Sequence, residues 1–253
     1  MTTTFKSRLN SYQPLIGTIL TLPTPELAEI CAQAGFDWLF LDMEHGLLDI
    51  PAVQRLAQAA GDCPCVVRVP AGDGTGIQRA LDTGVAGVII PQVNSAGQAA
   101  WAVRQAKYPP IGDRGTGVTR AHGYGARFAE YVANANAEVA VILQAEHIRA
   151  VEQIDSILAV DGVDAVIIGP YDLSASMGKA GQVSDPDVQA AITQIREACI
   201  AHHRPMGIFT PDMTTAQQAL HDRYTLLPVG IDGMLFTGMY HEIVVSLRTA
   251  TNK

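Results

Sequence analysis

Cysteine is scarce in this sequence, with four residues in 253. They are Cys31, Cys63, Cys65 and Cys199. The only close pair, Cys63 and Cys65, lacks the spacing of a zinc site or of a thioredoxin-type redox site. Buried, unreactive thiols are therefore the better interpretation of all four.

Basic residues are also few: 17 Lys and Arg stand against 25 Asp and Glu, for a formal net charge of −8. That charge opposes the phosphate neutralisation on which nucleic-acid binding depends. No stretch reaches the roughly 18 uninterrupted apolar residues that span a bilayer, and no long apolar run follows the N-terminal Met. We therefore expect neither a nucleic-acid nor a membrane partner, and we expect a cytoplasmic protein.

What the sequence does contain is an alternation of short, β-branched apolar runs with longer segments of helical periodicity. The predicted strands are residues 15–20, 38–42, 65–69, 87–91, 139–143, 165–169, 206–209 and 226–231. Nearly continuous apolar runs are typical of parallel strands covered on both faces. No Pro/Ser-rich linker divides the chain, so we predict one α/β domain over residues 1–253, a (β/α)₈ TIM barrel.

A doubly wound open sheet is the alternative architecture for such a repeat. Its dinucleotide-binding forms carry a Gly-rich turn after the first strand. Residues 20–25 read Leu-Thr-Leu-Pro-Thr-Pro instead. The pattern therefore favours the closed barrel.

One connection, residues 109–124, is too long and too rich in glycine for a routine link between a helix and a strand. Its glycines, with Arg114 and Arg120, would suit an anion cradle. A surface loop or a subunit contact is an equally good interpretation.

Active sites of such barrels lie at the C-terminal ends of the strands. The polar residues that close the apolar runs are Asp42, Glu44, His45, Arg68, Gln144, Glu146, His147 and Asp172. They are predicted to converge on one mouth. Among them, Glu146 and Asp172 come from adjacent strand ends and would suit Mg²⁺ or Mn²⁺, with open positions for water and substrate. Either residue taken alone would more simply open a helix.

His45 has three readings: a metal ligand, a structural histidine, or one half of a dyad in which Asp42 orients its ring. We prefer the Asp42–His45 dyad. Arg68 would point a fixed charge into the mouth, where a developing enolate oxygen could use it, although a lone Arg at a strand end is more often structural. Asp82, late in the third helix, has only a weak claim from its spacing.

Lysine is as rare as cysteine: the four are Lys6, Lys107, Lys179 and Lys253. None of them closes a predicted strand. A Schiff-base mechanism needs a desolvated amine inside the barrel. Covalent amine catalysis is therefore disfavoured, and a metal ion is expected to act as the electron sink.

At these residues the sequence resembles the class II pyruvate aldolases of the 4-hydroxy-2-oxo-heptanedioate aldolase family, also called HpcH/HpaI. The resemblance covers nearly the whole chain. Its most specific pieces are residues 35–45, 66–68, 108–117, 144–146 and 164–174. Several ordered motifs at matching spacing are much harder to match by chance than any single one.

The resemblance implies that Glu146 and Asp172 hold a divalent metal, Mg²⁺ or Mn²⁺, with Co²⁺ and Zn²⁺ as alternatives. It also implies a hexamer with sites near subunit contacts. The remaining expected roles are proton transfer for His45, orientation of His45 by Asp42, support of that dyad by Asp82, and substrate binding by Arg68, Gln144, Tyr171 and Phe209.

Two positions depart from the family pattern. Ile19 stands where a pocket tryptophan is familiar, and His147 stands beside the metal carboxylate, where a small hydroxyl residue is usual. His147 is an extra ligand or proton-transfer group in one interpretation, and simply opens a helix in the other. Both changes put the acceptor aldehyde in question.

The predicted function is the reversible aldol addition and cleavage of 4-hydroxy-2-oxo acids, with pyruvate or hydroxypyruvate as donor and an aldehyde as acceptor. Oxaloacetate decarboxylation through the same enolate is one alternative. A barrel that binds a 2-oxo acid without turnover is another. A related acyl-CoA-cleaving activity would need a basic nucleotide groove, of which the sequence gives no clear sign.

Overall fold

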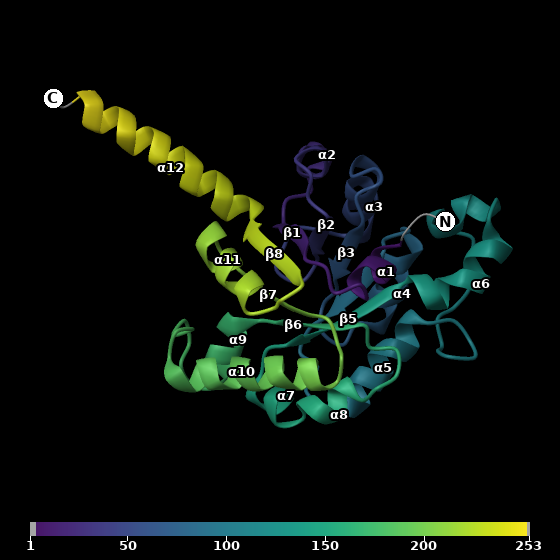
Figure 1. Ribbon diagram of the computed structural model, residues 1–253. Coiled ribbons are helices and arrows are strands. Elements are labelled where there is room, and N and C mark those ends of the chain that lie inside the picture. Colours follow the sequence, from purple (N-terminus) through teal and green to yellow (C-terminus); the bar gives the residue numbers. More distant parts are fainter. Residues whose placement is uncertain (1–3, 252–253) are drawn as a thin grey trace.

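Eight parallel strands close into a barrel in sequence order, with β1 pairing to both β2 and β8 in the computed structural model, which describes residues 4–251 (Figure 1). The strands are β1 (Leu15–Leu20), β2 (Trp38–Asp42), β3 (Cys65–Arg68), β4 (Gly87–Ile90), β5 (Ala140–Ala145), β6 (Ala165–Ile168), β7 (Met206–Ile208) and β8 (Leu226–Ile231). The predicted (β/α)₈ barrel is confirmed, and the open-sheet alternative is wrong.

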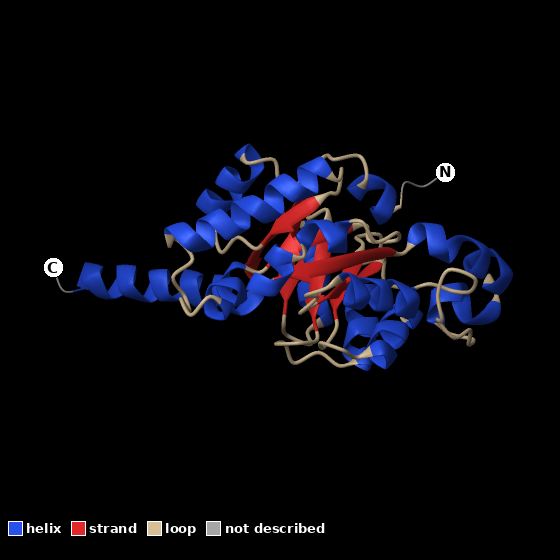
Figure 2. Cartoon of the chain, turned by 90° about the horizontal axis from the view of Figure 1, so that it is seen from below, coloured by secondary structure: helices blue, strands red, loops and turns tan. Residues whose placement is uncertain are grey.

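Helices surround the strands, as the blue ribbons around the red barrel show in Figure 2. They are α1 (Phe5–Leu9), α2 (Pro25–Gln33), α3 (Ile50–Ala59), α4 (Gly74–Asp82), α5 (Ala96–Ala106), η1 (Arg120–Gly125), α6 (Phe128–Glu138), α7 (Ile148–Glu152), α8 (Ile154–Leu158), α9 (Pro170–Ser176), α10 (Pro186–Ala201), α11 (Met213–His221) and α12 (Asp232–Thr251). Several begin at an Asp or Ser whose side chain accepts a backbone N–H, as Asp49 and Ser95 do.

The predicted strand boundaries were within two residues of those in the structure. The largest difference is at β5, which continues two residues past its predicted end at position 143. Gln144 is thus a strand residue that pairs with Ile167 of β6. A polar residue inside a strand breaks the apolar run from which the end of the strand was predicted.

The N-terminal half of the barrel interior is filled by a cluster of buried apolar side chains that includes Phe5, Leu15 and Trp38, which we call the plug. Trp38 is fully buried there, its ring centroid 5.9 Å from that of Phe5 in α1, and its indole N–H donates to the carbonyl of Leu15. A Cβ atom built on Gly17 would lie 2.6 Å from the Trp38 ring. Helix α1 therefore closes the N-terminal end of the barrel, and the polar side chains gather at the other end.

The long connection between α5 and α6 is held by a buried arginine. The Arg114 guanidinium lies 4.6 Å from the Tyr108 ring centroid and forms a 2.8 Å ion pair with Asp82. Arg120 donates to the backbone carbonyl of Thr83. Arg114 is thus buried and paired inside the chain, which argues against the anion cradle for this residue, whereas for Arg120 the cradle stays a prediction.

Helix α12 extends away from the barrel, as Figures 1 and 2 both show. Its exposed large apolar residues are Met234, Leu235, Phe236, Met239, Tyr240, Ile243, Val244, Val245 and Leu247. None of the helices within residues 4–251 combines the length and the apolarity needed to cross a membrane.

We predict that Gly17→Ala destabilises the fold by about 1–3 kcal/mol, because the new methyl group overpacks the plug against Trp38. The matched control is Gly97→Ala in α5, where the nearest atom to a new Cβ is the Ser95 hydroxyl at 3.9 Å. That change should stabilise by roughly 0.5–1 kcal/mol, since alanine favours a helix over glycine. Urea unfolding of both variants measures the difference, and equal effects would contradict the packing account.

Candidate active site

A small pocket of about 170 Å³ opens at the C-terminal ends of the strands. Its walls are Ile19, Phe40, His45, Arg68, Gln144, Ile167, Ile168, Gly169, Pro170, Tyr171, Asp172, Phe209, Pro228 and Ile231. Apolar walls with a few convergent polar groups are typical of small-molecule sites. The predicted substrate residues Tyr171 and Phe209 lie here together, with ring centroids 6.2 Å apart.

Arg68, which lines the pocket, is held by a two-point contact with Asp42. Its Nε lies 2.9 Å from one carboxylate oxygen of Asp42, and its Nη2 lies 2.6 Å from the other. Arg68 also rests over the Phe40 ring, 5.3 Å from the centroid. The two-point pair fixes both the direction and the plane of the guanidinium.

The predicted Asp42–His45 dyad stays a prediction, because Asp42 has other partners in the structure. Asp42 binds the guanidinium of Arg68, its register partner on β3, and also accepts the backbone N–H groups of Glu44 (3.0 Å) and His45 (3.2 Å). The His45 side chain is 66% exposed, and its Nε2 lies 3.8 Å from the Glu44 carboxylate. Asp42 therefore orients Arg68 and the backbone of the loop, whereas Glu44 is the acidic neighbour of the imidazole.

A line of contacts continues from Arg68 across the barrel mouth. The Gln144 Oε1 lies 3.5 Å from Arg68 Nη1, and the Gln144 amide donates to the Glu146 carboxylate. The other Glu146 oxygen accepts the backbone N–H of Gln92 at 2.8 Å. Gln92 adopts a left-handed backbone conformation, with φ of 55°, which turns its N–H toward this carboxylate.

The Glu146 carboxyl lies in an unusual electrostatic setting. The pKa of Glu146 is raised to about 7, chiefly by burial, with only 2% of the residue exposed, and in smaller part by the nearby Asp172 and Glu44 carboxylates. The hydrogen bonds from Gln92 and Gln144 act in the opposite direction. Burial likewise raises the pKa of Glu44. The mouth thus concentrates more negative charge than it neutralises.

The donor set fits a divalent cation. Glu146 is buried with Asp172 close enough to affect its pKa, and Gly169 leaves room, because a Cβ there would lie 2.8 Å from a Glu146 oxygen. Within residues 4–251 no group of three or more His, Cys, Asp or Glu side chains is placed to hold an ion. A cation here would therefore take two carboxylates and fill its other positions with water and substrate oxygens, as Mg²⁺ commonly does.

Two other predicted residues lie elsewhere. Asp82 ends α4, which runs back from the mouth toward the start of β4, and its carboxylate pairs with Arg114. Its support of the dyad therefore stays a prediction, which the contacts within one chain do not test. The ring of His147 accepts the backbone N–H of Arg149 at 3.1 Å and caps α7, as the simpler interpretation expected.

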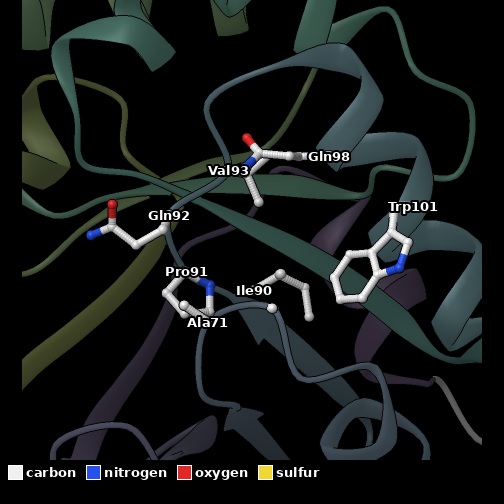
Figure 3. Close-up of a pocket in the computed structure, with 8 residues that line it drawn as sticks. Ala71, Ile90, Pro91, Gln92, Val93, Gln98 and Trp101 are labelled. Carbon is white, nitrogen blue, oxygen red and sulfur yellow. The ribbon is translucent and has the colours of Figure 1, made fainter.

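A larger pocket of about 520 Å³ lies beside the site, between the loops that follow β3 and β4. Its lining includes Ala71, Pro91 and Trp101 but no titratable side chain. Figure 3 shows Trp101 on the helix side of this pocket and the Gln92 side chain directed away from it. This larger hollow therefore lacks the groups for acid–base chemistry that the smaller pocket contains.

The sequence did not indicate the part played by two residues of the site. Glu44 is predicted to lie at the mouth but without a role of its own, whereas in the structure its carboxylate lies 3.5 Å from Arg68 and 3.8 Å from His45. Gln92 contributes a backbone N–H through a left-handed conformation, for which a non-glycine residue gives no sequence signal.

Comparison with known proteins identifies the family of this chain. The family model for HpcH/HpaI aldolase/citrate lyase matches residues 16–238. The chain belongs to this family. Among curated relatives, it is 40% identical to a hydroxypyruvate/pyruvate aldolase of Cupriavidus necator, covering 96% of this chain and 92% of the relative. It is also 40% identical to a 4-hydroxy-2-oxovalerate aldolase of Rhodococcus jostii, covering 90% and 89%.

Among solved structures, an HpcH/HpaI aldolase/citrate lyase family protein from Burkholderia cenocepacia superposes with a TM-score of 0.94 at 35% identity, covering 98% of this chain and all of that one. An HpcH/HpaI aldolase from Desulfitobacterium hafniense gives 0.90 at 34%, covering 97% of each chain. With aldolases at this level of identity over most of its length, this HpcH/HpaI family member is a carbon–carbon lyase.

We predict that, in the metal-free protein, the contribution of Glu146 to the free energy of unfolding falls as pH rises from 5 to 8. Its folded-state pKa is raised, so the stabilisation is complete below the unfolded value of 4.5 and is lost as pH rises through about 7. Urea unfolding of the metal-stripped protein measures this trend. The control is Glu146→Gln, which should flatten the pH dependence relative to the parent; parallel curves for the two proteins would refute the assignment.

Proposed function

We propose that this aldolase catalyses the reversible aldol addition and cleavage of 4-hydroxy-2-oxo acids, with pyruvate or hydroxypyruvate as donor and an aldehyde as acceptor. The observation that carries the proposal is the contact line from Arg68 through Gln144 to Glu146 at the small pocket. It offers a fixed cation, an amide and a buried carboxylate in one connected line. The names of the two curated relatives support the choice of donors.

Glu146 and Asp172 would hold a divalent cation, Mg²⁺ or Mn²⁺, with Co²⁺ and Zn²⁺ as alternatives. When bound there, such an ion polarises the keto group of the donor and so acidifies its C3 protons. The raised pKa of Glu146 supports this assignment, because an ionised carboxylate at this crowded position needs a positive neighbour.

The chain's own residues would orient the donor. Arg68, held in place by Asp42, faces the pocket and would stabilise the developing enolate oxygen. The Gln144 side-chain amide would form a hydrogen bond with the same end of the donor, the end that carries the enolate oxygen. Tyr171 and Phe209 form an aromatic wall where the aldehyde would enter, and Ile19 also lines the pocket.

His45 would transfer the proton at the aldehyde oxygen. It would protonate the new alkoxide during addition and remove that proton during cleavage. Its exposed ring lines the pocket and can exchange protons with solvent between turnovers. Glu44, rather than Asp42, is the carboxylate that would stabilise the protonated imidazole.

We expect the wild-type protein to exchange the C3 protons of pyruvate or hydroxypyruvate for deuterium in D₂O only when Mg²⁺ or Mn²⁺ is added. Mass spectrometry of the recovered acid measures the exchange. Glu146→Gln should weaken binding of the metal alone by at least about 100-fold and abolish exchange, since it removes a charged ligand. His45→Asn should keep metal binding and slow aldol cleavage by roughly 10²–10⁴-fold.

Glu152→Gln, an exposed carboxylate on α7, is the matched control and should change neither property. Equal loss of metal binding in His45→Asn and Glu146→Gln would overturn the division of roles. Absence of exchange for both donors with both ions, in folded protein, would overturn the proposed chemistry.

We also propose that the chain acts as a homo-oligomer, with a hexamer as the assembly that the family resemblance implies. The support is α12, which leaves the barrel and exposes nine large apolar side chains (Figure 1). Soluble proteins rarely expose an apolar surface of this extent without a partner. In a homo-oligomer, a second copy of the chain would cover this surface.

Light scattering after size-exclusion chromatography should therefore give a mass that is a multiple of the monomer mass. The double variant Ile243→Glu with Leu247→Glu should reduce it, because two charges would be buried in the contact. Thr249→Glu, on the same helix, is the control that should leave the mass unchanged. A monomeric wild-type protein would contradict the proposal.

A further inference from the structure

We propose that Asp232, the first residue of α12, is a positioning residue for the loop of residues 43–48 that carries His45. The inference rests on the proposed function, because it takes the part of His45 in proton transfer from there. Nothing in the chemistry of Asp232 requires it to touch the substrate. Its effect would pass through Thr21 to the backbone of the loop.

Asp232 is buried, with 3% of the residue exposed, and its two oxygens accept four hydrogen bonds. One oxygen takes the backbone N–H groups of Thr21 (2.8 Å) and Leu22 (3.0 Å). The other takes the Thr21 hydroxyl (2.6 Å) and the N–H of Gly233 (2.7 Å). All four donors are neutral, so only a group that accepts at both oxygens satisfies them. An amide in its place would leave donors facing a donor.

Thr21 connects Asp232 to the loop of residues 43–48. Its carbonyl accepts the N–H of Leu47 at 2.9 Å. Gly46 packs against it so closely that a Cβ there would lie 3.1 Å from the Thr21 Cα and 2.2 Å from the carbonyl oxygen of Asp42. The loop is thus clamped between Thr21 on one side and Asp42 on the other.

His45 lies between these two anchors. Its backbone N–H is held by Asp42, while its exposed ring has the Glu44 carboxylate 3.8 Å away, which is beyond hydrogen-bond range. The position of the ring over the pocket is therefore set by the backbone of the loop. The backbone in turn depends on Thr21 and on Asp232.

A bulge in β8 aims Asp232 at Thr21. Gly17 pairs with Pro228 and Ile19 with Ile231, so β8 has one residue more than β1 across this step. Gly230 falls in the bulge with a left-handed φ of 67°. Such bulges redirect the side chains that follow them, and here the residue after the strand turns its carboxylate toward the end of β1.

The test compares Asp232→Asn with Asp212→Asn, another Asp at the start of a helix, which caps α11 without contacting the loop. Asp232→Asn should lower kcat of aldol cleavage by roughly 10–100-fold with little change in KM for the donor, as misplacement of a catalytic group does. Affinity for the metal alone should stay as in wild type. Hydrogen–deuterium exchange of the peptide covering residues 43–48 should become faster. Asp212→Asn should leave kcat and this peptide unchanged.

Thr21→Val gives a second variant, since it removes only the hydroxyl contact and should produce a smaller change of the same kind in both readouts. Light scattering checks that the oligomer is intact, because Asp232 also begins α12. A fall in kcat with unchanged exchange at residues 43–48, or with a changed mass, would overturn the inference. An inactive wild type would count against the proposed function alone, because the exchange comparison tests the coupling without turnover.

Discussion

Closure of the barrel between β1 and β8 is the constraint from which the geometry of the site follows. Eight parallel strands in a closed ring bring all their C-terminal ends to one mouth. Asp42 and Arg68 then face each other because they are register partners on neighbouring strands. At the seam itself, the β8 bulge brings Asp232 to the end of β1. The seam that completes the fold thus lies next to the loop that carries His45.

Much of the fold could be predicted because a closed parallel barrel has a strong signature in the apolar pattern. Each strand is covered on both faces, so it reads as a short continuous run, and turn residues separate it from the next helix. The apolar pattern is weaker where a strand contributes a polar residue to the site. Gln144 breaks the run of β5 and made the strand look shorter than it is. The course of α12 could not be predicted either, because periodicity indicates a helix without saying what it packs against.

The site was predictable as a set of residues and less so as a set of contacts. Strand ends identify Arg68, Glu146 and Asp172 because topology alone brings them together. The partner of Asp42 is different: three residues separate it from His45, yet the neighbouring strand offers a guanidinium with two parallel N–H groups, and that match is stronger. Sequence separation says little about contacts across strands. Gln92 depends on a backbone conformation that its residue type does not reveal.

The balance of charge at the mouth bears on how an anionic substrate enters. The mouth carries the carboxyl groups of Asp42, Glu44, Glu146 and Asp172 together with the guanidinium of Arg68, which Asp42 already neutralises. A 2-oxo acid would approach a site with a surplus of negative charge, which repels it. Protonation of Glu146 removes only one charge. A divalent cation between Glu146 and Asp172, as proposed above, removes two and at the same time offers the substrate a positive centre next to Gln144. The excess negative charge that would repel the substrate from the metal-free protein is thus what would bind the cation, and the bound cation would attract the substrate.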